Sequence, residues 1–575
     1  MTEDTLNNKF NDPFNKVQFG VSIGERNQLE EFSKVLRSGA RMVEVDIASV
    51  YGLEGEQGNA ADTIGKTERE AIANLAKVND VDLSVHAPWA VNFSGINPQS
   101  KKKEPTYEHV VEREIGTALQ FADDISKKME RKNMPVIFHA SSDNFADPDK
   151  NTVYTIYDTK DEGVKQFPGE EINLGIDVNA VNPGDIKKTA ENKFRHMYGE
   201  ELFQKLFSHG ENGKSTALIS DDGKVILKPA GAFEFEKEKF AQQFIQERET
   251  IDFSLRNLEN KKIDALNRIT AAKAANDING IQKGQKDLED TIKSIKVLEG
   301  KKDELRIEEE TLDKRFVPYD SIIPKLAAEG IAKAAMFSYK NTESKPVILV
   351  ENPMSPEMSL SNPAETAEAV KIAREEFAKN LQEQNHVSQR EAQRISSELI
   401  GINLDVGHLN VFKSYINPKT GQLYSDKDIV EMAKSASDYL KRYHLNDNMG
   451  NKDSHLPLGQ GTAPIKEVYD AMMDKGLDVP AIMEVFGGLG GLEAGTVQSL
   501  QYMGAPLYGN LPYVSLPSYL GQPYSSIVGD YSSYSNLGLK QDMFSYGGFS
   551  NIFPSVGGGY MDNKGNSSFS GAPVV

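Results

Sequence analysis

The sequence of 575 residues contains no cysteine. Disulfide bonds and thiolate metal ligands are therefore excluded, so any metal ion must bind to histidine, aspartate or glutamate side chains. No run of hydrophobic residues approaches the eighteen or so that a membrane-spanning helix requires. The amino-terminal segment, MTEDTLNNKFNDPFNK, lacks the apolar core of a secretory signal. We therefore expect a cytoplasmic protein with no membrane partner.

An excess of basic residues is also missing. The chain has 65 Lys and Arg residues against 85 Asp and Glu residues, which gives a net charge of −20. Such a chain has no overall positive field to attract nucleic acid, although a local basic face or bound cations can do the same work. Hydrophobic residues make up 38% of the chain. This fraction allows a large core and leaves a sizeable polar part outside it.

Short apolar runs alternate with helical segments along most of the chain. The runs are VQFGVSIG (17–24), ARMVEVDIA (40–48), VDLSVH (81–86), MPVIFH (134–139), KPVILVE (345–351), LIGINLD (399–405), RYHL (442–445) and VPAIME (479–484). Alternating strands and helices predict a parallel sheet with crossover helices. An open doubly wound sheet has its site at one switch point. Here six successive strands end in a metal-ligand type of residue, which favours a closed α/β TIM (β/α)8 barrel with its chemistry at the carboxyl ends of the strands.

Imidazoles and carboxylates are concentrated at these strand ends and in the loops that follow, most densely between Leu404 and His455. The candidate metal ligands are His86, His139, Glu351, Asp405, His408, His444, Asp453, His455 and Glu484. They would be ordinary polar loop residues if each stood alone. Burying all of them without cations would cost many kcal/mol. Since one ion needs three or four protein ligands, nine ligands indicate two or three ions, with a carboxylate bridging at least one pair.

The residues alone leave two kinds of chemistry open. Adjacent divalent ions favour phosphoryl hydrolysis, because they lower the pKa of a water molecule and stabilise the leaving oxygen. A single ion suits the isomerisation or epimerisation of a sugar or sugar phosphate, in which a side chain moves a proton.

A long insertion separates the two barrel halves, which we place at 1–143 and 345–504. Within the insertion (144–344) we expect a small mixed element (144–232), a helical coiled-coil hairpin (233–316) and a helical return (317–344). Ile281, Leu288 and Ile295 repeat every seven residues, and ANDING (275–280) breaks the helical pattern. The hairpin is either a self-paired arm with solvated charges or a surface for self-association or partner docking. The segment 505–575 is rich in Tyr, Ser and Gly, and we expect it to be disordered.

The strand-end motifs resemble those of a known family. VHAPWAVNFSG, IFHAS, VENP, LDVGH, HLND, DSH followed by LGQG, and IMEVFGG are similar, in the same order, to the metal-site motifs of endonuclease IV. This is the AP endonuclease family 2, within the xylose-isomerase-like TIM-barrel superfamily. The resemblance covers Val17–Asp143 and Lys345–Gly488. The insertion, the acidic charge balance and the aromatic tail lie outside the family pattern.

The resemblance implies a site with up to three Zn²⁺ ions, for which Mn²⁺ is the alternative. His86, His139 and Glu351 would hold the first ion. Glu351 would bridge to a second ion, which Asp405, His444 and Glu484 complete, and His408, Asp453 and His455 would hold the third. The carboxylates Glu351, Asp405 and Glu484 are the expected catalytic residues. The family cleaves DNA on the 5′ side of an abasic site and trims blocked 3′ ends, so damaged DNA is the implied partner. A small sugar or phosphorylated substrate is the partner under the one-ion alternative.

Overall fold

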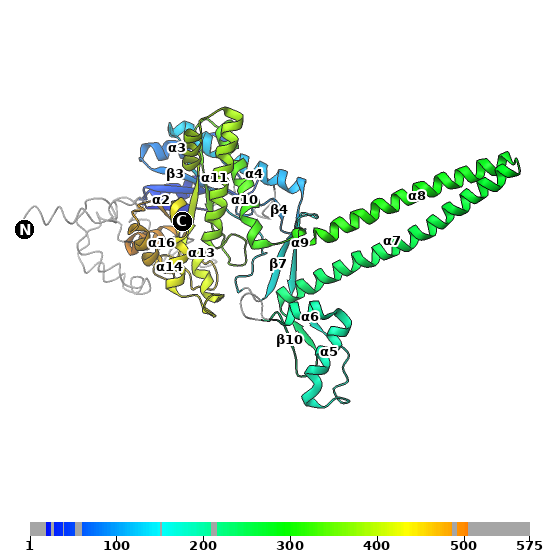
Figure 1. Ribbon diagram of the computed structural model, residues 1–575. Helices are drawn as coiled ribbons and strands as arrows, with labels where there is room; N and C mark the ends of the chain where they lie inside the picture. The colour runs from blue at the N-terminus through cyan, green and yellow to red at the C-terminus, as the bar shows by residue number, and fades with distance from the viewer. Residues whose placement is uncertain are drawn as a thin grey trace, which may run out of the picture. The chain divides into compact units, whose positions relative to one another are not determined.

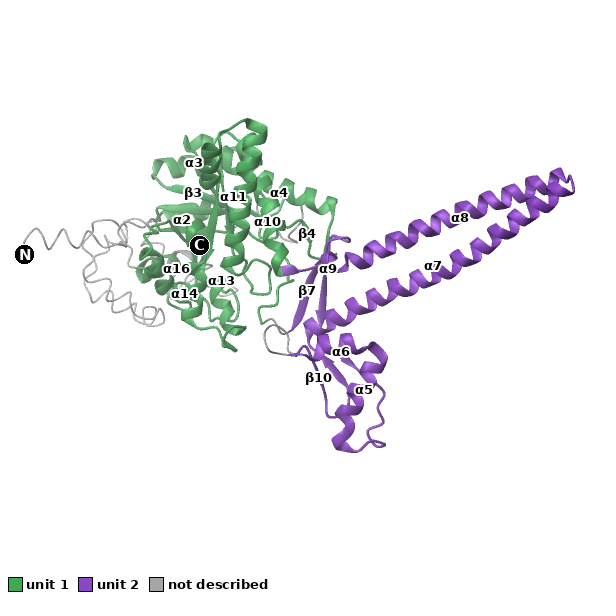
Figure 2. Cartoon of the chain, in the orientation of Figure 1, with its two compact units in different colours: residues 1–149, 320–575 green, residues 150–319 purple. Residues whose placement is uncertain are grey.

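The computed structural model describes residues 19–24, 28–37, 40–51, 60–149, 152–208, 215–485 and 491–503. The chain forms two units, of which unit 1 contains residues 1–149 and 320–575, and unit 2 contains residues 150–319 (Figure 2). The segment 505–575, for which the sequence predicts disorder, lies outside the described residues. Unit 2 interrupts unit 1 between the fourth and the fifth barrel strand.

Eight parallel strands close into a barrel in unit 1. They are β1 (Phe19–Ile23), β2 (Met42–Asp46), β3 (Asp82–His86), β6 (Pro135–His139), β13 (Val347–Glu351), β14 (Ile400–Asp405), β17 (Leu440–Leu445) and β18 (Ala481–Met483). Each strand pairs with its neighbours in chain order, and β18 pairs with β1 to complete the ring. The predicted TIM-barrel fold is therefore confirmed.

Helices cover the outside of the barrel, which explains why its strands are apolar on both faces. The helices of unit 1 are α2 (Gln28–Arg37), α3 (Lys66–Val78), α4 (Pro105–Met129), α10 (Tyr319–Asn341), α11 (Pro363–Asn385), α12 (Gln389–Leu399), α13 (Val406–Asn410), α14 (Asp426–Lys434), α15 (Ile465–Met473) and α16 (Gly491–Tyr502). Two short hairpins are added, β4 (Ile96–Asn97) with β5 (Lys102–Lys103), and β15 (Ile416–Asn417) with β16 (Gln422–Leu423). Among the described residues, no helix combines the length and the hydropathy needed to cross a membrane.

The strand register brings the candidate ligands to one end of the barrel. Glu351 pairs with His139 across β13 and β6, and Asp405 pairs with His444 across β14 and β17. His86 is the last residue of β3. Because all eight strands are parallel, these carboxyl-terminal residues surround the same opening.

Unit 2 has its own core. Its first sheet contains β9 (Glu170–Ile172), β10 (Ala217–Ile219) and β11 (Val225–Leu227), and α5 (Ile186–Tyr198) and α6 (Glu200–Phe207) pack their apolar side chains against it. Around Phe194, the rings of Tyr198, Phe207 and Phe235 lie within van der Waals reach. A second group of strands contains β7 (Val153–Asp158), β8 (Gly163–Pro168) and β12 (Phe316–Pro318), the last preceded by α9 (Leu312–Arg315).

Two long helices form the predicted antiparallel hairpin. They are α7 (Pro229–Ala274) and α8 (Ile278–Glu310), which run side by side over most of their length (Figure 1). The turn lies at 275–277, inside the segment where the sequence pattern breaks. The Asp277 side chain accepts a hydrogen bond from the backbone amide of Gly280 at 3.0 Å and so caps α8.

A buried ion pair joins the strands of unit 2, and it gives a prediction for stability. The Asp158 side chain is fully buried and accepts hydrogen bonds from Arg315 Nε at 2.8 Å and from Lys165 Nζ at 2.6 Å. Burial opposes ionisation, but these two cations hold the pKa of Asp158 below its usual value. The stabilisation is complete above the pKa of an unfolded aspartate, about 4, and is lost as the pH falls toward the lower folded pKa.

We expect Asp158→Asn to reduce the local free energy of unfolding of β7 and β8 by about 3 kcal/mol at neutral pH, because the partly buried Arg315 and Lys165 lose the charge of their fully buried partner. Amide hydrogen exchange of these strands measures the change. Asp161→Asn is the matched control, since the exposed Asp161 carboxylate lies 3.4 Å from the same Arg315 and Lys165 and exposed pairs contribute about 0–1 kcal/mol. Equal effects of the two substitutions would contradict the prediction.

Candidate metal centre

The structure brings the nine predicted ligands together at the carboxyl ends of the barrel strands. Glu351, Asp405 and His444 are fully buried, and His86 and His455 are the most accessible, with 12% and 19% of their side chains exposed. Several sets of three or four of their nitrogen and oxygen atoms lie within 4.8 Å of one another. The three other described histidines, His109, His196 and His386, are exposed and lie outside this cluster.

Glu351 lies at the middle of the cluster and directs its two oxygens to different histidines. Its Oε2 atom is 3.3 Å from His86 Nε2 and 3.9 Å from His139 Nε2. Its Oε1 atom is 3.0 Å from His444 Nδ1. A carboxylate with this arrangement can bridge two cations, as predicted for Glu351.

On the second side of Glu351, the Nδ1 atom of His444 is also 2.9 Å from Glu484 Oε1. Asp405 offers an oxygen within 4.8 Å of the oxygens of Glu351 and Glu484. In the predicted second group, Glu351 and Glu484 thus lie next to His444, whereas the ligand atoms of Asp405 gather with those of Glu351, Glu484 and the imidazole of His408.

The third predicted group lies at the edge of the cluster. Asp453 Oδ2 is 3.3 Å from His408 Nε2 and 2.6 Å from His455 Nε2. His455 adopts a φ of 46°, a left-handed conformation that is uncommon for residues other than glycine. Strain of this kind is retained where the surrounding structure fixes a side chain in place.

The spacing of the ligand atoms fits small divalent cations. Tetrahedral zinc with bonds of about 2.0 Å places its ligand atoms about 3.3 Å apart. The distances given above, from 2.6 to 3.9 Å, lie around this value. One oxygen of Glu351 (Oε2), the Nδ1 atom of His139 and one oxygen of Asp453 (Oδ1) are buried without a hydrogen-bond partner. Buried polar atoms without partners are costly, and the donor set of imidazoles and carboxylates suits zinc or manganese.

Hydrogen bonds to backbone carbonyls orient three of the imidazoles. The Nδ1 atoms of His86, His408 and His455 lie 2.8, 2.8 and 3.2 Å from the carbonyl oxygens of Ala87, Asn352 and Glu484. A carbonyl oxygen only accepts, so each Nδ1 carries a proton, and each Nε2 faces the centre. Such outer contacts are typical of metal-binding histidines.

His444 is turned the other way, and a carboxylate that the sequence analysis missed lies behind it. Its Nδ1 atom faces the centre, while Nε2 is 2.9 Å from Glu44 Oε1. Glu44 is fully buried in β2; its Oε2 accepts a hydrogen bond from Ser84 Oγ at 2.8 Å and lies 3.5 Å from Arg442 Nη1. Glu44 therefore stabilises the orientation in which the Nδ1 atom of His444 faces Glu351. An acidic residue inside the apolar run MVEVD was the sequence signal that could have identified it.

Without metal ions, some of the ligand side chains are protonated at neutral pH. Burial lowers the pKa of His139 to about 3 and raises that of Asp405 to about 7. For His86 the adjacent Glu351 carboxylate outweighs burial and raises the pKa to about 10. Since cations bind the deprotonated ligands, uptake of metal at neutral pH releases protons.

The family-like motifs pack on one another around the centre. Asn446 of HLND donates a hydrogen bond from Nδ2 to Asp405 Oδ2 at 2.8 Å, and a Cβ atom at Gly407 of LDVGH would lie 1.7 Å from the Asn446 side chain. Asp447 accepts hydrogen bonds from the backbone amides of Gly459 and Gly461, both at 2.9 Å. Asp447 thus closes the loop that carries Asp453 and His455. A side chain at Gly407, Gly459 or Gly461 would collide with neighbouring atoms, which explains why these motifs contain glycine at these positions.

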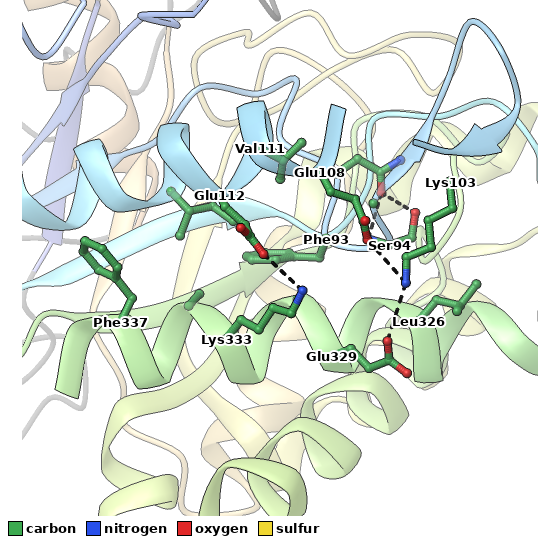
Figure 3. A pocket seen from close by; sticks show the side chains of 15 residues that line it. Phe93, Ser94, Lys103, Glu108, Val111, Glu112, Leu326, Glu329, Lys333 and Phe337 are labelled. Atoms are coloured by element: carbon green, nitrogen blue, oxygen red, sulfur yellow. Dashed lines mark hydrogen bonds and ion pairs between the residues drawn. The ribbon is translucent and has the colours of Figure 1, made fainter. Parts of the chain in front are cut away.

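A separate cavity of about 190 Å³ lies between α4 and α10 in unit 1 (Figure 3). Phe93 and Phe337 contribute to its apolar lining. Its charged groups are already paired, with Lys333 Nζ 3.0 Å from Glu112 and Lys103 Nζ 3.4 Å from Glu108. None of the nine candidate ligands lines this cavity. We therefore assign the chemistry to the cluster at the strand ends.

A comparison with protein-family models agrees with the fold. A family model described as "Xylose isomerase-like TIM barrel" (AP endonuclease family 2) matches residues 361–505. A solved structure of a D-tagatose 3-epimerase-like protein has 11% sequence identity and a TM-score of 0.35, and the match covers 81% of this chain and 90% of that chain. The structure described as AsfvAP:AG has 11% identity and a TM-score of 0.32, with 84% and 97% covered. A search of curated protein sequences found no significant match.

Proposed function

We propose, on a barrel whose second half matches the xylose isomerase-like TIM-barrel family, that this protein is a metal-dependent phosphodiesterase of the endonuclease IV type. It hydrolyses DNA at abasic sites or at blocked 3′ ends, with up to three Zn²⁺ ions held by the nine ligands. The segment 361–505 contains six of these ligands, Asp405 to Glu484. The predicted resemblance to this superfamily is confirmed for that part of the barrel.

The bridging position of Glu351 is the observation that carries the proposal. One of its oxygens faces His86 and His139, and the other faces His444. A site for a single ion does not need a carboxylate between two sets of histidines. The third group, in which Asp453 lies between His408 and His455, further exceeds the ligand set of one ion.

The chain's own residues would orient and shield the substrate phosphate. Bound divalent cations would supply an acidified water and offset the charge of the phosphate oxygens. The buried carboxylates of Glu351, Asp405 and Glu484 would determine where the cations bind, and the buried site excludes bulk water. This local concentration of positive charge would also allow a chain with a net charge of −20 to bind DNA.

The test is incubation of the purified protein with a DNA duplex that carries one abasic analogue. We expect incision on the 5′ side of the lesion, a 3′-hydroxyl product, no incision of the undamaged duplex and loss of activity on chelation. Absence of incision with zinc or manganese supplied, under conditions in which an endonuclease IV control cuts, would reject the proposal.

A sugar or sugar-phosphate isomerase or epimerase with one divalent ion is the second candidate. The observation that favours it is that Glu351, Asp405, His408 and Glu484 bring four ligand atoms within 4.8 Å of one another, which is enough for one ion. One tightly bound ion per chain, together with turnover of a ketose by the same preparation, would favour this function.

A further inference from the structure

Half of the large hydrophobic side chains that are exposed in the described residues lie on the hairpin of α7 and α8. They are Ile245, Phe253, Ile263 and Leu266 on α7, and Ile278, Ile292, Val297 and Ile307 on α8. Their exposed fractions range from 37% for Ile292 to 70% for Ile278 and Val297. Large apolar side chains concentrated in one place mark an interaction surface.

The hairpin buries few side chains by itself. Beyond the first two turns of α7, the buried residues of the two helices are Ile251, Ala265, Ile269, Gly284, Ile295 and Leu305. Helices of this length receive most of their stability from the packing of an apolar face. Figure 2 shows the two helices extending from the remainder of unit 2 as a pair. The hairpin therefore exposes more large apolar side chains than it buries.

Ion pairs between the helices fix which exposed residues lie at the same level. Arg268 on α7 is 3.2 Å from Asp287 on α8. In an antiparallel pair this contact places Ile263 at the level of Ile292, and Leu266 shares a face of α7 with Ile263 because it follows three residues later. We call Ile263, Leu266 and Ile292 the outer patch.

A second group lies nearer the open end of the hairpin. Arg248 is 2.8 Å from Glu309, which places Ile245 near the level of Ile307. We call Ile245 and Ile307 the inner patch. Eighteen residues, or five full turns, separate Ile245 from Ile263, so the two side chains lie on one face of α7 about 27 Å apart.

We propose that two copies of this chain associate through the hairpin, antiparallel to each other, with the outer patch of each copy on the inner patch of the other. A two-fold axis midway between the patches makes both contacts at once, as a symmetric dimer requires. The axis passes near the level of Phe253, which is 66% exposed.

The charge distribution favours a second copy as the occupant. Residues 245–307 contain 13 basic and 12 acidic residues, whereas the whole chain has an excess of 20 acidic residues. The hairpin carries almost no net charge, so two copies can approach each other there with little repulsion, whereas the acidic excess lies in the rest of the chain. Its alternating Lys and Glu residues can also pair across the two-fold axis. A basic partner would instead be drawn to the acidic remainder.

Sedimentation velocity of the full chain tests the proposal. We expect a dimer at micromolar concentration for the natural sequence and a monomer for the double variant Ile263→Glu with Leu266→Glu, because four charges would be placed in the dimer interface. Thr250→Glu with Asn257→Glu is the matched control, since both residues are exposed on the same helix and lie more than about 100° around it from Ile263 and Leu266. The control is expected to stay dimeric. A monomeric natural chain, or a dimeric Ile263→Glu, Leu266→Glu variant, would overturn the proposal.

Cross-linking tests the orientation without relying on the charged variant. Because the chain has no cysteine, Ile245→Cys and Ile263→Cys can be prepared as single-cysteine proteins. Oxidation of their mixture is expected to give disulfide-linked dimers containing one copy of each, and little cross-linking of either protein alone. Cross-linking of each variant only to itself, or of neither, would contradict the antiparallel arrangement. This outcome is independent of any activity at the barrel.

Discussion

The Glu351→Gln variant is expected to lose at least two metal ions per chain and to incise abasic DNA roughly 10³-fold more slowly, or worse. Glutamine keeps the volume of the side chain and removes its charge. Because each oxygen of Glu351 faces a different set of histidines, the substitution weakens two ion sites together. A ligand that served one ion would affect one site alone.

Glu343→Gln is the control for Glu351→Gln, since Glu343 is an exposed carboxylate shortly before the same strand. Metal content by mass spectrometry and incision by gel assay should both stay unchanged in the control. If Glu351→Gln retained three ions and normal incision, the bridging role would be wrong. If it lost one ion only, Glu351 would belong to one site and the proposed trinuclear arrangement would fail.

The Glu44→Gln variant is expected to bind zinc roughly ten- to hundredfold more weakly, the loss measured when an outer partner of a metal ligand is removed. Glu44 touches no other candidate ligand as closely as it touches His444, whose Nε2 lies 2.9 Å away. The charge of Glu44 favours the proton on Nε2 and leaves Nδ1 free to bind. Competition of the protein with a zinc chelator measures this affinity without any activity assay.

A variant of another buried carboxylate in unit 1 is the control that distinguishes an effect on metal binding from an effect on stability. Glu114 on α4 is 1% exposed and accepts hydrogen bonds from the backbone amides of Val50 at 3.1 Å and Tyr51 at 2.6 Å. Glu114→Gln should lower the thermal stability of the metal-free protein and leave its zinc affinity unchanged. An equal loss of affinity in both variants would mean that Glu44 acts through the fold and not through His444.

The barrel and the strand-end residues could be predicted from the sequence for a physical reason. Parallel strands end at one opening, so ligand-type residues that close successive apolar runs must meet there. His139 after PVIF and Asp405 after IGINL are such residues, and the register places each beside another candidate ligand. The hairpin was predictable because ANDING (275–280) interrupts the helical pattern between two long segments.

Other features gave too weak a signal to be placed from the sequence. Glu44 lies two residues before the end of β2, and a strand that is buried on both faces shows no alternation that would mark the inward side. The sheets of unit 2 contain strands of only three residues, such as Ala217–Ile219, which are too short for a periodic signal. The exposed residues Phe253 and Val297 fall outside the heptads, so their role as a surface emerges only from the structure.

Metal analysis of the purified protein tests the central claim most directly. The account predicts close to three zinc or manganese ions per chain after exposure to either metal and removal of the excess. It also predicts release of protons on binding at neutral pH, because the metal-free imidazoles of His86 and His455 are protonated there. One ion per chain, or none, would contradict a phosphate-cleaving cluster of cations at the strand ends.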